Sequence, residues 1–177
     1  MSDLDEEIVI NDANIFIDLI SINLLEKLIE LDLSFQTTDF VIKELMDTDD
    51  KKQKDNIKDL IIQENKISII SFSNKELNEI DKIQKRNNGL SYTDSSCIYL
   101  AKKVKGILLT GDNLMRKLVK KSKIEIHGII WIFDKLLEIN IINYEVAIKK
   151  MEVLLEINQW LPVKICRNRI KKWEKMM

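Results

Sequence analysis

Two kinds of apolar pattern alternate along the first 140 residues of the chain. Short apolar runs rich in β-branched residues are typical of strands buried on both faces of a parallel sheet. Longer stretches, with apolar residues three and four positions apart, predict helices between these runs. The predicted strands are residues 7–11, 33–36, 67–72, 106–110 and 124–126.

The predicted helices alternate with these strands. They cover residues 15–31, 40–46, 59–62, 73–85, 90–104, 113–121 and 129–137. Ser73 and Glu76 have the spacing of a capping box at the start of one of them. The nearly all-charged segment 47–56 is predicted to be a solvated turn. This alternation of strands and helices predicts an α/β fold, a three-layer sandwich with a parallel sheet of four to five strands.

The pattern becomes purely helical after residue 140. One helix is predicted over residues 144–155, and another begins at Pro162, since proline is favoured in the first turn. We therefore expect two parts, an α/β domain over residues 1–139 and a helical extension over residues 140–177 that packs on it.

Composition narrows the class of protein. The 177 residues are 45% hydrophobic, which is typical of a globular chain that can bury its own core. The net charge of −1 does not by itself indicate nucleic-acid binding. Cys97 and Cys166 form neither a disulfide framework nor a zinc motif, so we expect reduced core thiols. The N-terminus is acidic and no apolar run is long enough to span a membrane, which predicts a cytoplasmic protein without a membrane partner.

Four acidic residues stand where the surrounding sequence is apolar: Asp12, Glu44, Asp94 and Asp112. Asp12 and Asp112 follow directly on predicted strands, and the other two lie near the starts of predicted helices. A carboxylate among apolar neighbours needs a cation or hydrogen-bond donors to keep its charge. Few basic residues lie beside these acids in the sequence, so the pattern favours a metal site.

The predicted topology brings the four acids to one edge of the sheet. Ligands of parallel α/β sheets bind outside the carboxyl ends of the strands. Helices that return between strands begin at that same edge, and this places Glu44 and Asp94 there as well. Asn14 and Thr110 stand beside the acids, where they can hydrogen-bond a carboxylate, a metal-bound water or a phosphate.

Clustered carboxylates suit one kind of cofactor. They repel one another in a poorly solvated site, and hard oxygen ligands favour Mg²⁺ or Mn²⁺. Such ions activate water and neutralise charge on a phosphoryl group. The chemistry that fits is hydrolysis of a phosphodiester.

Four segments in order resemble the PIN domain: Ile10 to Asn14, Val41 to Leu45, Leu90 to Asp94 running into Leu100 and Ala101, and Leu109 to Asp112. The resemblance covers roughly residues 7–135. It implies a metal-dependent ribonuclease, as in the VapC-type toxins of toxin–antitoxin pairs. It also implies that Asp12, Glu44, Asp94 and Asp112 bind metal, and that Asn14 and Thr110 support them.

The resemblance sets expectations for partners. RNA is the expected substrate, and an antitoxin protein is the partner expected of a VapC-type toxin. Apolar helices in excess of one small sheet are compatible with a homodimer. The alternative function is a non-catalytic PIN-like module that binds RNA or a protein without cutting. A metal titration separates the two, because a pure scaffold binds no divalent ion at this edge.

Each acid also has a purely structural interpretation. Asp12, with Asn14, and Asp112 can cap the helices that follow them, and Asp94 can form a capping box with Ser91. Glu44 can be a surface acid. These readings would have to hold together at four positions in the expected order, which is why the metal site is preferred.

Other candidate residues carry weaker signals. We expect Asp18 on an exposed helix turn and Asp134 on the surface, and we assign no general-base role to His127. Trp131 and Trp160 are expected in the core or at an interface. The last helix combines an apolar stripe with six basic residues; it predicts a docked helix with a solvated face, or a phosphate-contacting surface for RNA.

Three other α/β classes fit less well. A phosphoaspartyl receiver needs an acid after the third strand, where the chain has Ser73 and Asn74. A phosphatase of the haloacid-dehalogenase type needs a second acid at the position of Asn14. A dinucleotide enzyme needs a glycine-rich turn after the first strand, and the chain has none there.

Overall fold

The fold is described here from a computed structural model, which describes residues 7–63 and 66–177. Its centre is a five-stranded, fully parallel sheet with the order β3-β2-β1-β4-β5. The strands are β1 (Ile8–Asn11), β2 (Ser34–Thr38), β3 (Ser68–Ile70), β4 (Ile107–Leu109) and β5 (Ile126–His127). The predicted α/β class and parallel sheet are therefore confirmed.

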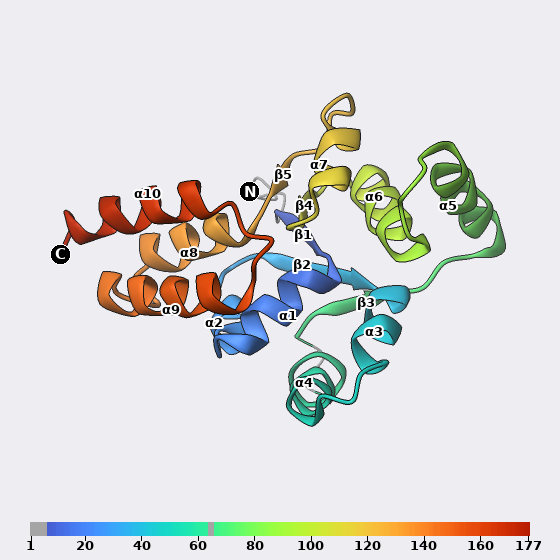
Figure 1. The fold of residues 1–177 in the computed structure, drawn as a ribbon. Helices are drawn as coiled ribbons and strands as arrows, with labels where there is room; N and C mark the ends of the chain where they lie inside the picture. Colours follow the sequence, from blue (N-terminus) through green and yellow to red (C-terminus); the bar gives the residue numbers. More distant parts are fainter. Residues whose placement is uncertain (1–6, 64–65) are drawn as a thin grey trace, which may run out of the picture.

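Helices cover both faces of this sheet (Figure 1). They are α1 (Ala13–Ser21), α2 (Leu25–Leu28), α3 (Asp39–Met46), α4 (Lys51–Asn56), α5 (Asn74–Arg86), α6 (Tyr92–Val104), α7 (Asn113–Val119), α8 (Ile129–Glu138), α9 (Tyr144–Ile157) and α10 (Val163–Glu174), with a π-helical stretch over Ile57–Gln63. None of the helices in the described residues combines the length and apolar character that a membrane crossing requires.

The strand order places a switch point between β1 and β4. The chain goes from β1 to β2 and β3 on one side, then crosses back to β4 and β5 on the other side of β1. The register pairs Asn11 with Leu109, and the backbone N–H of Asp12 donates to the Leu109 carbonyl at 3.1 Å. The residues that follow β1 and β4 are therefore neighbours, which is where parallel α/β sheets place their ligands.

Two predicted elements differ from the structure. The helix expected over residues 15–31 is split into α1 and α2, because Asn23 adopts a left-handed backbone with φ 53°. The charged segment expected to be a turn contains α4. Asp50 caps this helix, and the Gln53 side chain donates to the Leu45 carbonyl at 2.7 Å, so a polar contact docks a helix that has little apolar surface.

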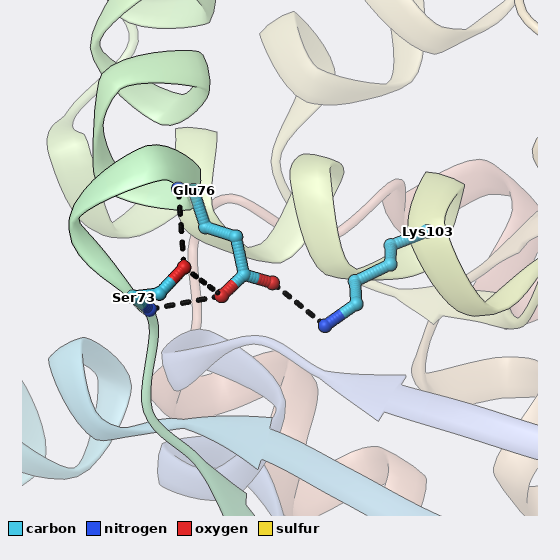
Figure 2. A network of polar contacts seen from close by, with 3 residues as sticks. All are labelled: Ser73, Glu76 and Lys103. Atoms are coloured by element: carbon cyan, nitrogen blue, oxygen red, sulfur yellow. Dashed lines mark hydrogen bonds and ion pairs between the residues drawn. The ribbon is translucent and has the colours of Figure 1, made fainter.

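The predicted capping box at the start of α5 is confirmed (Figure 2). The Glu76 carboxylate accepts from the Ser73 backbone N–H at 2.8 Å and also pairs with Lys103 of α6 at 2.6 Å. These contacts hold the pKa of Glu76 down to about 2, with the Lys103 hydrogen bond as the largest cause. The cap therefore also ties α5 to α6.

The C-terminal helices pack on the sheet domain through α8. The ring of Trp173 on α10 lies 5.6 Å from that of Phe133 on α8, and both side chains are buried. Cys166 and Ile170 complete the buried face of α10, and Arg169 forms an ion pair with Asp134 at 2.9 Å. Both cysteines are free and buried, as expected. The division at residue 139 stays a prediction.

Candidate active site at the carboxyl edge of the sheet

Asp12 is the most deeply buried of the predicted site acids, with 3% of its surface exposed. It follows β1 and caps α1 by accepting from the Ala13 N–H at 2.7 Å. Its other oxygen accepts from the Thr110 hydroxyl at 2.8 Å and from the Asn14 amide at 2.9 Å. Three donors therefore fix the orientation of this carboxylate, and none of them is a cation.

The charge of Asp12 is poorly compensated. Burial raises the pKa of its carboxyl to about 7, and the nearby acids Asp94 and Glu44 raise it further. The Thr110 and Ala13 hydrogen bonds act in the opposite direction and do not offset the burial. A carboxyl that is half protonated near neutral pH is a group to which a bound cation would restore the charge.

Cys97 gives an independent view of the same convergence. Burial raises the pKa of its thiol well above the ordinary value, and the charges of Asp12, Asp94 and Glu44 all add to this effect. Because charge interactions weaken with distance, these acids lie around one region of the α6 helix. Residues separated by up to 82 positions in the sequence thus share one electrostatic environment.

Asp94 and Asp112 each use one carboxylate oxygen to cap a helix. Asp94 accepts from the Ser91 N–H at 2.8 Å, and Asp112 accepts from the Met115 N–H at 2.7 Å. The structural readings of Asp12, Asp94 and Asp112 as capping residues are therefore all present. The second oxygen of Asp94 and of Asp112 makes no hydrogen bond within the described part of the chain, so capping leaves both acids with a free ligand atom.

Asp112 is joined to Asp12 through a shared hydroxyl. Its backbone N–H donates to the Thr110 hydroxyl oxygen at 3.0 Å, and that hydroxyl donates to Asp12. Asn14 completes the connection, since its side-chain oxygen accepts from the Gly111 N–H at 2.9 Å.

Glu44 is exposed on α3 and makes no hydrogen bond or ion pair among the residues that the structure describes. Its position relative to α6 is fixed by a contact that sequence reasoning missed. The hydroxyls of Thr38, which caps α3, and Ser96, on α6, are 2.9 Å apart and buried. This contact holds the helix of Glu44 against the helix of Asp94.

Arg116 is a second residue that the sequence did not point to. Its guanidinium donates to the Thr110 carbonyl at 2.6 Å, and burial lowers its pKa from the ordinary value. It passes over Gly128, where an added Cβ would collide with the guanidinium. The structure thus places one half-buried cation behind the strand that carries Thr110.

The structure also shows the surroundings of the weaker candidates Asp18, His127 and Trp160. Asp18 is buried, not exposed, because the Asn158 amide donates to it at 2.8 Å. His127 stacks on the half-buried Trp131, with ring centres 5.1 Å apart. Trp160 is 82% exposed, so of the two places expected for it the core is wrong, and an interface stays a prediction.

A preassembled metal centre is absent from the described residues. Within residues 7–63 and 66–177, no three side chains of His, Cys, Asp or Glu are grouped so that they could hold a metal ion. The acids are therefore close enough for Asp94 and Glu44 to raise the pKa of Asp12, but their side chains are not grouped as a set of metal ligands.

A parallel sheet with acids gathered at its switch point defines the class of the protein, an α/β protein with an acidic site at the carboxyl edge. A family model described as a PIN domain (DUF3368) matches residues 8–175, and the chain belongs to this PIN domain family. The match includes all of α9 and α10. No curated protein matches the chain.

The fold is also similar to a solved structure, the crystal structure of VapBC2 from Rickettsia felis bound to a DNA fragment from their promoter. The TM-score is 0.50 and the sequence identity is 18%. The alignment covers 68% of this chain and 98% of the other. At this identity the likeness concerns the fold, and it agrees with the PIN assignment.

Proposed function

We propose that this protein is a metal-dependent endoribonuclease that hydrolyses RNA phosphodiester bonds in the cytoplasm. The observation that carries the proposal is the state of Asp12, a buried carboxylate with a pKa raised to about 7 and with Asp94 and Glu44 adding to its repulsion. A purely structural cap gains nothing from such surroundings, since a neutral Asn or Ser would cap α1 as well. Membership of the PIN domain family, whose members are generally nucleases, supports the same conclusion.

The donor set fits Mg²⁺ or Mn²⁺ as the cofactor. All the candidate ligands are carboxylate oxygens, which these ions prefer. Asp12, Glu44, Asp94 and Asp112 would hold the ion. When bound, it would activate water and neutralise charge on the phosphoryl group.

The other residues of the site act on the acids themselves. Thr110 and Asn14 orient the Asp12 carboxylate by two hydrogen bonds, and the Gly111 backbone in turn holds Asn14. Thr38 and Ser96 hold α3 and α6 together, which keeps Glu44 and Asp94 on the same side of the sheet. These contacts preorganise the carboxylates before any ligand arrives.

The test is cleavage of a labelled single-stranded RNA by the purified chain with Mg²⁺, with Mn²⁺ and with EDTA. We expect cleavage that requires the metal, and a loss of at least about 1000-fold in Asp12→Asn and Asp94→Asn, since removing a carboxylate removes a metal ligand. Asp81→Asn, on α5, is the matched control and keeps full activity. Cleavage that survives in both site variants, or in EDTA, would refute the proposal.

The second candidate is a non-catalytic PIN-like module that binds RNA or a protein. The caps formed by Asp12, Asp94 and Asp112 favour it, because each acid then has a structural reason to be present. Titration with Mn²⁺ separates the candidates. The nuclease is expected to bind Mn²⁺ saturably, and Asp12→Asn should remove this binding. A scaffold is expected to show no such binding.

We also propose an antitoxin protein as a partner and a toxin–antitoxin role for the chain. The support is the likeness in fold to a VapBC2 structure and the family assignment. A small gene next to the gene of this chain, whose product co-purifies with it and inhibits cleavage, is the expected finding. Size measurement of the purified chain tests the homodimer, which we expect at twice the mass of 20.8 kDa.

A further inference from the structure

Helix α10 differs in charge from the rest of the molecule. Residues 163–177 contain six basic residues and one acidic residue, whereas the whole chain contains 28 basic and 29 acidic residues. The remaining sequence therefore has 22 basic against 28 acidic residues. A positively charged helix is thus attached to a negatively charged body, and clustering of this kind is a footprint of nucleic-acid binding.

Four of these cations lie on one side of α10. At 3.6 residues per turn, Lys164, Arg167, Lys171 and Lys175 fall on the side opposite the buried Cys166, Ile170 and Trp173. All four are exposed, and none forms an ion pair in the described residues, where the only pair on this helix is Arg169 with Asp134. We call these four residues the basic stripe; it spans about 16 Å along the helix axis.

Trp160 lies just before this stripe, in the loop between α9 and α10. It is 82% exposed, which is unusual for the largest apolar side chain. The loop is nevertheless held in place. The Asn158 side chain accepts from the Trp160 N–H at 3.0 Å and donates to Asp18 on α1 at 2.8 Å. A fixed loop therefore presents a flat aromatic ring to the solvent.

The same anchor connects the loop to the candidate active site. Asp18 lies six residues after Asp12, which is about 9 Å further along α1. In Figure 1 the linker between α9 and α10 (orange to red) turns back toward α1, and α10 then runs away from it to the C-terminus. The loop that carries Trp160 is thus fixed to the helix that Asp12 caps, with the basic stripe extending beyond it.

We propose that the basic stripe and Trp160 form a binding track for single-stranded RNA, which leads the strand toward the acids at the sheet edge. This inference rests on the proposed function for its direction of travel. The stripe contacts phosphates, whose charge dominates the affinity for nucleic acids, and the indole stacks on an unpaired base. The stripe itself consists of four charged side chains, and the exposed apolar residues of this helix, Val163 and Ile165, lie outside it. It therefore offers charges to phosphates and lacks the apolar anchors that an acidic protein partner would need.

Charge-neutral substitutions test the stripe. The variant carries Lys164→Gln, Arg167→Gln, Lys171→Gln and Lys175→Gln. The control carries Lys51→Gln, Lys52→Gln, Lys54→Gln and Lys58→Gln and loses the same net charge in and just after α4. Binding of a fluorescein-labelled, unstructured 20-nucleotide RNA (about 20 to span track and site) is measured in EDTA over a range of KCl concentrations.

The stripe variant is expected to bind at least about tenfold more weakly at low salt, with a salt slope lower by about 3, because each phosphate contact contributes about 0.7. The control variant is expected to stay near the wild type. Equal losses in the two variants, or no loss in either, would overturn the proposal. Polyglutamate that competes as well as RNA at equal charge would also overturn it and would identify the stripe as a surface for an acidic protein.

Trp160 is tested by its chemistry. Trp160→Ala is expected to weaken binding of the single strand by about tenfold and to leave duplex RNA unaffected, whereas Trp160→Phe keeps most of the stacking. With Mg²⁺, both the stripe variant and Trp160→Ala should raise KM for the long RNA and leave kcat unchanged. Cleavage of an oligonucleotide of about four nucleotides, too short to reach the track, should not change.

These binding measurements stand apart from the proposed function. If the wild type binds RNA through the track but never cleaves it, the nuclease proposal fails and the track remains. If it cleaves RNA and the stripe and Trp160 variants bind and cleave like the wild type, the track fails and the nuclease remains.

Discussion

Helix α1 buries two aspartates in different ways, one at its first turn and one near its last turn. Asp12 is 3% exposed and Asp18 is 7% exposed, and burial is the largest cause of the raised pKa of both. Asp18 has only the Asn158 amide as its partner, and its pKa is about 6. Asp12 has three hydrogen bonds, yet its pKa is about 7, because its burial is the largest influence and the charges of Asp94 and Glu44 act in the same direction.

This comparison separates a structural acid from a candidate functional one. Asp18 links α1 to the loop after α9, so its burial secures a tertiary contact across 140 residues. Asp12 is better supplied with donors and is still held near neutrality, since its burial outweighs them and the charges of Asp94 and Glu44 also oppose its ionisation. Burial alone is therefore no sign of a site; burial with unneutralised like charge is.

The comparison is tested most strongly by Asp12→Asn in the metal-free protein. A pKa raised from 3.8 to about 7 stabilises the fold below pH 4, and this stabilisation is lost as the pH rises to 7. The variant should therefore be more stable than the wild type by about 4 kcal/mol at pH 8, the equivalent of about three pKa units. Urea denaturation measures this, and the difference should vanish near pH 4.

Divalent metal should offset most of the stability difference between Asp12→Asn and the wild type. Mn²⁺ at one hundred times its Kd is expected to stabilise the wild type by about 2.7 kcal/mol, since it binds only the folded state. The effect should be larger at pH 8 than at pH 5.5, because Asp12 must lose its proton to bind. Asp18→Asn should keep the stabilisation and Asp12→Asn should lose it; a loss in both would mean that the two acids do not differ.

Asp18→Asn gives the smallest effect. The Asn158 amide can still donate to the new side chain, and only the buried charge is removed. The variant should gain about 2 kcal/mol at pH 8, somewhat less than the full value of a two-unit pKa shift, because part of the carboxyl stays in contact with water. The gain should fade between pH 6 and pH 4, one unit lower than for Asp12→Asn, because the pKa of Asp18 is about 6. A gain that is larger than that of Asp12→Asn would contradict the ranking.

Much of the fold can be predicted from local sequence. An apolar run rich in β-branched residues identifies β1, and apolar positions three and four residues apart identify α6. The spacing of Ser73 and Glu76 identifies the start of α5, and Pro162 marks the start of α10. These features depend on residues a few positions apart. The acids that follow β1 and β4 can also be predicted to lie at one edge of the sheet, because the carboxyl ends of parallel strands meet at the same edge.

The rest depends on residues that are far apart along the chain. The Thr38–Ser96 contact spans 58 positions and the Asp18–Asn158 contact spans 140, so no local pattern contains them. Asn23, with its left-handed backbone, divides a continuous helical pattern. Trp160 is exposed, although its large apolar side chain predicts burial. The sequence by itself determined which elements form and which acids follow the strands. Only the tertiary structure decided which side chains lose water and which charges face each other, because both depend on packing between distant segments.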